Sequence, residues 1–217
     1  TGILIAGLRR PATLAKALAT LDTLSEGRLD VGVGVGWQHQ EYDANGVSYK
    51  GRGALLDETL DICQTLWTKT SANYQSNAVQ FEKVHLNPKP VHPGGVPIWV
   101  SGRLNPKVLQ RITRFGAGWI PWGDDAQNPV EGLKKIREEL AKVGRNADGF
   151  QCTSHIRVAK QDNGKPDYNA TFEPVGQMCE GGITDFRITV ALPNEKAAIE
   201  DYLSPFVEAF RKVTGRT

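Results

Sequence analysis

Three glycine-rich segments, each at the end of an apolar run typical of a buried strand, carry the residues best suited to bind a ligand. They are Gly32-Val33-Gly34-Val35-Gly36-Trp37, Ser101-Gly102-Arg103-Leu104-Asn105-Pro106 and Gly118-Trp119-Ile120-Pro121-Trp122-Gly123. Glycine at the end of a strand allows a ligand to approach the backbone closely. Because parallel sheets bind ligands at the carboxyl ends of their strands, these positions favour a ligand site at that end of a sheet.

The second segment combines two features that attract an anion. Asn105 followed by Pro106 is typical of the cap and first turn of a helix, and unpaired amides at a helix N-terminus favour negative charge. Arg103 adds a fork of donors that suits a phosphate. An ordinary capped helix with a solvated Arg103 explains the same residues equally well, so both interpretations stay open.

Structural explanations also compete at the other two segments. A dinucleotide-binding fingerprint needs glycines at offsets zero, two and five, and from Gly32 or Gly34 the third position is Trp37 or His39. Tight packing of the strand against a helix explains these glycines about as well as a site does. In the third segment Trp119 and a second tryptophan could wall a flat ring system, although core or rim packing is the commoner role.

The sequence contains no recognisable metal or nucleophile motif. The histidines His39, His85, His92 and His155 lack helical ligand spacing, and neither a G-x-S-x-G elbow nor a phosphate-binding G-x-x-x-x-G-K-[ST] loop occurs. His39 and Glu41 lie just beyond the first glycine-rich strand, so they are candidates for a proton donor. A surface role is the commoner one for a loop histidine, and no catalytic residue is assigned.

Composition excludes several other classes of function. The 217 residues hold 26 Lys and Arg against 24 Asp and Glu, a net charge of +2, which argues against a nucleic-acid surface. No apolar stretch reaches the ~18 residues of a membrane span. The three cysteines are far apart and match neither a metal site nor a disulfide framework, so a reducing, cytoplasmic location is expected.

Six strand–helix units are predicted along the chain, which implies an α/β fold with a parallel sheet and helices outside it. Strands are expected at 2–6, 29–35, 97–101, 118–121, 150–158 and 185–192, and helices at 11–27, 54–69, 105–115, 129–144 and from an Asn194 cap onward. Two stretches interrupt the alternation: 73–95, which suggests a small hairpin, and the irregular 161–182. Neither resembles a linker, so a single domain over 1–217 is expected.

In combination these segments resemble the luciferase-like monooxygenase family, which includes FMN-dependent and coenzyme F420-dependent oxidoreductases. The resemblance is carried by Leu18-Ala19-Thr20-Leu21-Asp22-Thr23-Leu24-Ser25-Glu26-Gly27-Arg28-Leu29 running into Gly32–Trp37, then by Asn87-Pro88-Lys89-Pro90-Val91, Pro97-Ile98-Trp99-Val100 and Phe115-Gly116-Ala117-Gly118-Trp119-Ile120-Pro121. It implies a (β/α)₈ TIM barrel of the luciferase-like type. A barrel has eight units and about 250 residues, so the first two units, roughly 60 residues, are expected to precede this sequence.

The resemblance also implies a cofactor site at the C-terminal mouth of the barrel. Gly2-Ile3 matches a bulged strand position that often holds a non-proline cis peptide behind the cofactor ring. Gly34 to Gly36 match positions beside the ring or phosphate, and Gly102 with Arg103 matches a backbone grip on the phosphate. The implied cofactor-binding residues are Gly2, Ile3, Gly34, Val35, Gly36, Ser101, Gly102, Arg103 and Trp119.

The first glycine-rich segment, together with Glu41, is most similar to the F420-dependent subgroup. Val35 stands where bacterial luciferase has an arginine that grips the FMN phosphate, which disfavours that mode of FMN binding. The implied activity is F420-dependent hydride transfer to or from a small organic substrate, with an FMN-dependent monooxygenase as the alternative. A non-redox phosphate-binding barrel and a non-catalytic cofactor-binding barrel stay open. Family members often dimerise, so a homodimer is expected.

Overall fold

The computed structural model describes residues 2–215 and shows two compact units, the first ending at Trp119 and the second beginning at Ile120. Both contain helices and parallel strands, which confirms the predicted α/β class. The expectation of a single domain over 1–217 stays a prediction.

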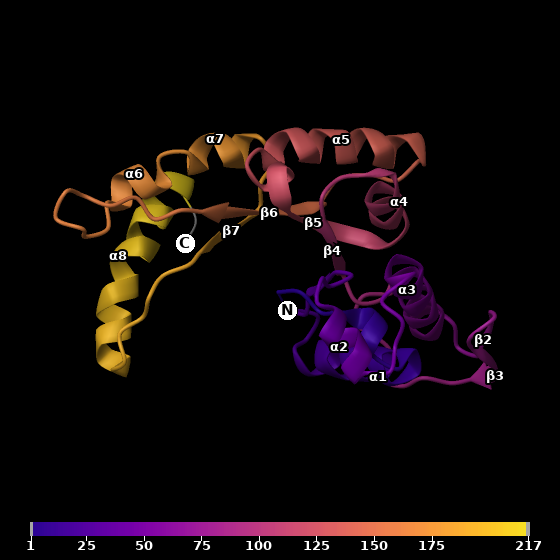
Figure 1. The fold of residues 1–217 in the computed structure, drawn as a ribbon. Coiled ribbons are helices and arrows are strands. Elements are labelled where there is room, and N and C mark those ends of the chain that lie inside the picture. The colour runs from indigo at the N-terminus through magenta and orange to yellow at the C-terminus, as the bar shows by residue number, and fades with distance from the viewer. Residues whose placement is uncertain (1, 216–217) are drawn as a thin grey trace. The chain divides into compact units, whose positions relative to one another are not determined.

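The first unit, indigo to magenta in Figure 1, places helices around two paired parallel strands and a hairpin. Its elements are η1 (Ala6–Leu8), α1 (Pro11–Leu24), β1 (Val31–Val33), α2 (His39–Ala44), α3 (Arg52–Thr68), β2 (Ala72–Gln75), β3 (Gln80–Val84), β4 (Ile98–Gly102), α4 (Pro106–Phe115) and β5 (Gly116–Pro121), which crosses the boundary. β1 pairs with β4 in parallel, with Val31 opposite Ile98. β2 and β3 form the antiparallel hairpin that the sequence suggested.

Apolar side chains of α1 and α3 form the core of this unit. Pro11 starts α1, as its fixed φ and missing N–H allow at a first helical position. Leu18, Leu60 and Cys63 are buried, and the indole Nε1 of Trp67 donates to the α1 backbone 2.9 Å away. Every residue of β1 is buried, as expected of a parallel strand covered on both faces.

The predicted strand over 2–6 is wrong in extent. Only Leu4 pairs, through a parallel bridge to Val33, with its N–H 2.7 Å from the Gly32 oxygen. The chain then turns through η1, where Ala6 and Gly7 are buried. A Cβ on Gly7 would lie 3.3 Å from Leu55 of α3, so this stretch is apolar because it turns beneath a helix.

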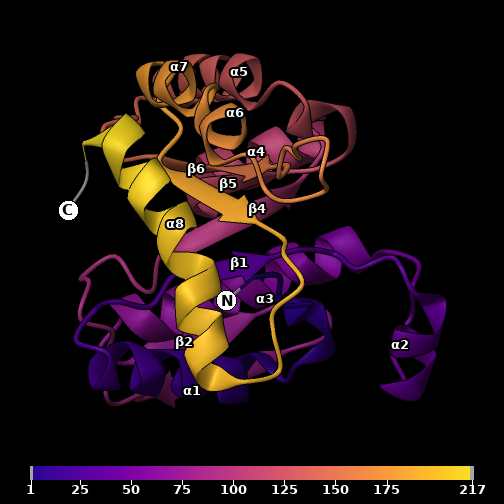
Figure 2. The ribbon, with the colours of Figure 1, turned by 90° about the vertical axis from the view of Figure 1, so that its left-hand side faces the viewer.

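The second unit places helices against the parallel pair β6 (Gln151–Ile156) and β7 (Asp185–Ile188), in which Thr153 lies opposite Asp185. Its other elements are η2 (Gly123–Ala126), α5 (Pro129–Lys142), α6 (Tyr168–Phe172), α7 (Val175–Glu180) and α8 (Lys196–Thr214). Figure 2 shows α8 in yellow beside β7. Rings from α6, β7 and α8 form an aromatic cluster: Phe172, Phe186, Phe206 and Phe210.

Two expectations for this unit are corrected. The stretch 161–182 contains α6 and α7; each has six residues or fewer, too short to show a helical repeat in the sequence. The last helix is capped at Glu195, one residue beyond the predicted Asn194, and no side chain bonds to its N-terminus. Pro205 lies inside this helix.

Candidate functional site

Residues from three distant segments of the first unit meet at the carboxyl ends of its parallel strands. Leu4 bridges to Val33 at the end of β1, and β1 pairs with β4, which carries Ser101. A Cβ on Gly34 would lie 3.0 Å from the Cγ2 of Ile3 and 3.8 Å from the Cβ of Ser101. Three of the predicted site residues are therefore neighbours.

The two central glycines of the first segment are explained by close packing. Gly34 is buried against Ile3, and a Cβ on Gly36 would lie 3.2 Å from the Cδ1 of Ile5. Gly36 also has φ +67°, a conformation that glycine adopts without strain. One explanation of these glycines from the sequence was tight packing of the strand against a helix. In the structure, Ile3 and Ile5 of the opening segment pack against them instead.

Tyrosine hydroxyls hold the backbone on both sides of Gly36. Tyr42 of α2 donates to the Val35 oxygen at 2.6 Å, and Tyr49 donates to the Trp37 oxygen at 3.3 Å. Burial raises the pKa of Tyr42 above its ordinary value, so its hydroxyl stays protonated as a donor. The conformation of this loop is therefore fixed by named bonds.

The start of α4 is capped as predicted, and the cap changes the argument for an anion. The Asn105 Oδ1 accepts from the amides of Lys107 at 3.0 Å and Val108 at 3.1 Å. Pro106 has no N–H to offer. An anion at this helix start would therefore depend on groups that precede the cap and on the helix dipole.

Gly102 lies where β4 approaches α4. Its φ is +154°, and a Cβ there would lie 3.3 Å from Val108. Its oxygen accepts a hydrogen bond from the indole Nε1 of Trp119 at 3.0 Å. Trp119 is fully buried, so it fixes Gly102 from within the core, whereas Trp122 is 58% exposed.

The two candidate proton donors face different surroundings. His39 is exposed, and its ring stacks on Tyr49 with centroids 3.6 Å apart. Glu41, two residues later in α2, lines a cavity of about 440 Å³ together with Ile3 and other residues of the opening segment. Residues two apart on a helix point in different directions. Of the two, Glu41 is therefore the one beside the strand-end residues.

The expected cis peptide between Gly2 and Ile3 is wrong. Within residues 2–215 the cis bond is Asn87–Pro88. A non-proline cis bond costs about 3–4 kcal/mol and persists where its surroundings enforce it.

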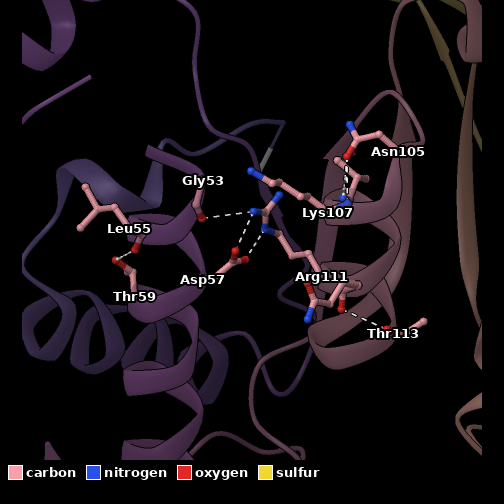
Figure 3. A network of polar contacts seen from close by, with 10 residues as sticks. Gly53, Leu55, Asp57, Thr59, Asn105, Lys107, Arg111 and Thr113 are labelled. Atoms are coloured by element: carbon pink, nitrogen blue, oxygen red, sulfur yellow. Dashed lines mark hydrogen bonds and ion pairs between the residues drawn. The ribbon is translucent and has the colours of Figure 1, made fainter. Parts of the chain in front are cut away.

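Sequence reasoning missed the polar residues that support these loops. Arg111 of α4 is buried, with a 5% exposed side chain, and binds the Asp57 carboxylate and the Gly53 oxygen of α3 (Figure 3). The available signal was a charged residue on the face of a helix that also carries Val108 and Ile112. That signal does not identify the partner 54 residues away.

The described residues contain neither a metal-ligand cluster nor a membrane-spanning helix. In the part of the chain from residue 2 to 215, no three His, Cys, Asp or Glu side chains gather as metal ligands would. No helix in the same part is long and apolar enough to cross a membrane.

Comparisons with known proteins give the chain its relatives. Rv0953c, an uncharacterized protein of Mycobacterium tuberculosis, is 41% identical over 138 residues, which cover 63% of this chain and 48% of that protein. The F420-dependent glucose-6-phosphate dehydrogenase of Segniliparus rotundus is 32% identical over 155 residues, 69% of this chain and 45% of that enzyme. The chain thus spans about half the length of the curated relatives it matches.

A solved structure shares the fold. The coenzyme F420 dependent tetrahydromethanopterin reductase of Methanopyrus kandleri aligns with a TM-score of 0.70 at 14% identity, covering 93% of this chain and 80% of that one. A family model described as luciferase-like monooxygenase matches residues 1–165, which include every strand-end loop described above. This match covers well over half of the sequence, and the chain belongs to the luciferase-like monooxygenase family.

Proposed function

We propose that the protein is an F420-dependent oxidoreductase that transfers hydride to or from a small organic substrate. The observation that carries the proposal is the meeting of Ile3, Gly34 and Ser101 at the carboxyl ends of parallel strands in a luciferase-like chain. Parallel α/β folds bind ligands at this end. A relative that is 32% identical is named as F420-dependent, which favours this cofactor.

The residues present fit the chemistry of such a cofactor. Gly102 is partly exposed and has no side chain, so a ligand can approach its backbone closely. Ser101 and Arg103 supply a hydroxyl and a guanidinium, which are donors that suit phosphate. Ile3, whose side chain is 42% exposed, offers an apolar surface for a flat ring.

Different residues would hold the two ends of the cofactor. Ser101, Gly102 and Arg103 hold the phosphate end, while Ile3 packs against the ring. Bound F420 supplies hydride chemistry that no side chain can supply. Glu41, in the cavity beside Ile3, is the candidate for moving a proton to or from the substrate.

FMN is the alternative cofactor, in a monooxygenase of the same fold. Val35 disfavours the phosphate grip of bacterial luciferase, and its carbonyl is already bonded to Tyr42. An expected homodimer stays a prediction. A cytoplasmic location is proposed because Cys63, Cys152 and Cys179 are all free thiols.

A phosphate-binding or non-catalytic barrel is the second candidate, and one observation favours it. Close packing accounts for Gly34 and Gly36, and the Asn105 cap satisfies two amides at the start of α4. Glycines and a helix N-terminus can therefore occur here without a redox cofactor.

Titration with F420 and with FMN, each up to about 1 mM, tests the proposal by the visible absorption and fluorescence of the ring. That limit corresponds to about 4 kcal/mol of affinity. We expect F420 to bind more tightly than FMN. Binding of neither would overturn the proposal, and binding of inorganic phosphate alone would support the second candidate.

A charge placed at the phosphate end gives the sharper test. Gly102→Glu is expected to abolish binding, because a carboxylate beside Arg103 repels the phosphate. Gly102→Ala measures the backbone strain alone, since φ is +154° and Val108 is close. Gly94→Glu adds the same charge where a Cβ has open space, and should bind as the parent does. Equal losses in all three variants would count against a phosphate grip at Gly102.

A further inference from the structure

An ion pair between a buried arginine and a partly exposed aspartate joins the two helices that follow the two candidate loops. The Arg111 Nε lies 2.5 Å from Asp57 Oδ1, and its Nη2 lies 2.9 Å from Asp57 Oδ2 (Figure 3). The same Nη2 donates to the Gly53 oxygen at 3.1 Å. One guanidinium thus binds a carboxylate with two nitrogens and a backbone carbonyl in the first turn of α3. This geometry fixes α4 relative to α3, because the fork is planar and directional.

The start of α3 is in turn connected to the first candidate loop. The guanidinium of Arg52, the residue before Gly53, lies 3.9 Å from the centroid of the Tyr49 ring. Tyr49 donates to the Trp37 oxygen and contacts the ring of Tyr42 edge-on at 5.3 Å. Together with the Tyr42 bond to Val35, these contacts hold both carbonyls that flank Gly36. The loop from Gly34 to Trp37 therefore depends on the position of the first turn of α3.

The other side of the ion pair is connected to the second candidate loop. Arg111 lies one turn after Val108 on the same face of α4, and both are buried. Val108 is the side chain nearest to where a Cβ on Gly102 would lie, at 3.3 Å. The amide of Val108 also binds the Asn105 cap. A shift of α4 would therefore move the backbone that runs from Gly102 to Asn105.

We infer that Arg111 is a positioning residue that holds the loop 34–37 and the loop 102–105 at a fixed separation. The inference rests on the proposed function in one respect, namely that these two loops bind the cofactor. An ion pair with one partly exposed partner is weak support for stability, since solvent screens the attraction between its charges. Such a pair does define one relative placement of two helices, which is what two loops on one ligand require.

The same two helices provide a matched control. Arg114 of α4 binds Asp61 of α3, one turn further from both loops. The Arg114 side chain is 54% exposed, against 5% for Arg111, while the two carboxylates are similarly exposed, Asp61 at 33% and Asp57 at 39%. Exposed pairs of this kind contribute little. Lysine in place of either arginine keeps the charge and removes the planar fork.

Amide hydrogen exchange in the protein without cofactor tests the inference directly. Arg111→Lys should raise exchange at least tenfold in both loops, 34–37 and 102–105, and Arg114→Lys should raise it in neither. An increase spread evenly over the first unit, or confined to the contact between α3 and α4, would show a merely stabilising role and overturn the inference. Should Arg111→Lys fail to fold, Asp57→Asn leaves the bond to Gly53 and gives the same comparison.

Binding measurements separate this inference from the proposed function. Arg111→Lys should weaken F420 about tenfold while leaving the affinity for the phosphate-free deazaflavin ring nearly unchanged, because only the full cofactor spans both loops. Equal weakening of both ligands would overturn the inference and leave the proposed function intact. Absence of F420 and FMN binding in the parent protein would remove the proposed function, while the exchange result would still decide whether Arg111 couples the loops.

Discussion

The two compact units hold their aromatic side chains in different ways. In the first unit, three of the four buried rings with a polar atom donate to backbone carbonyls: Tyr42 to Val35, Trp67 to Ala15 and Trp119 to Gly102, whereas the Trp99 Nε1 has no partner within residues 2–215. In the second unit, rings pack against rings around Phe206, with Tyr168 at 4.8 Å, Tyr202 at 5.7 Å and Phe172 at 6.4 Å between centroids. The first arrangement is directional, and the second is mainly apolar burial.

This difference shows where the fold needs exact backbone placement. A hydrogen bond from a rigid ring fixes the position of one carbonyl, whereas burial of apolar area is not directional. Two of the three carbonyls that these buried rings bind, those of Val35 and Gly102, belong to the candidate loops. The ring cluster of the second unit holds α8 against β7, a task that many apolar side chains of the right volume can perform.

Phe206→Ala should give the largest effect that tests this comparison. The ring is 2% exposed and contacts three other rings, so its removal leaves a cavity. We expect the free energy of unfolding to fall by about 3–5 kcal/mol. Denaturant unfolding followed by circular dichroism measures it.

Val207→Ala is the matched control for that change. Val207 is the next residue of α8, but its side chain is 45% exposed, so the loss should be a small fraction of that for Phe206. Similar losses in both variants would mean that the ring cluster does not carry the stability of this unit.

Local signals in the sequence predicted the longer elements well. Pro11, Asn105 and Pro129 mark the starts of α1, α4 and α5 within one residue, because caps and first-turn prolines act on their own helix. The helices α2, α6 and α7 were missed, since each has six residues or fewer and buries too few side chains to show a period.

The sequence predicted which residues of the candidate site lie next to one another. It did not predict the polar contacts that hold those residues in place. The adjacency of Gly34 and Ser101 follows from the rule that the carboxyl ends of parallel strands align. The pairing of Arg111 with Asp57 depends on how α4 docks on α3, and one sequence carries no signal for a contact 54 residues apart. The Asn105 cap was predicted, but its effect on the anion argument required knowing which amides it occupies.

Tyr42→Phe tests one of the directional hydrogen bonds of the first unit, with a smaller expected effect on the free energy of unfolding. The variant keeps the ring and removes the hydroxyl that donates to Val35 at 2.6 Å. We expect a loss of about 0.5–1.5 kcal/mol in the free energy of unfolding, the usual net value of one hydrogen bond. Tyr202→Phe in the ring cluster should change stability by less than about 0.5 kcal/mol. Equal changes in the two variants would remove the proposed difference between the units.

The smallest effect concerns one buried thiol in each unit. Burial raises the pKa of Cys63 and of Cys152 from 9.0 to about 12, so both are protonated and unreactive at pH 8. The folded-state pKa lies above the unfolded one, so this contribution to stability is complete below pH 9 and lost as pH rises from 9 to 12.

At pH 8, iodoacetamide should modify the partly exposed Cys179 first. Peptide mass spectrometry should then show Phe206→Ala speeding the reaction of Cys152, and Tyr42→Phe that of Cys63. Equal acceleration at both thiols would mean that the two units open together, and the contrast between them would concern bonding alone.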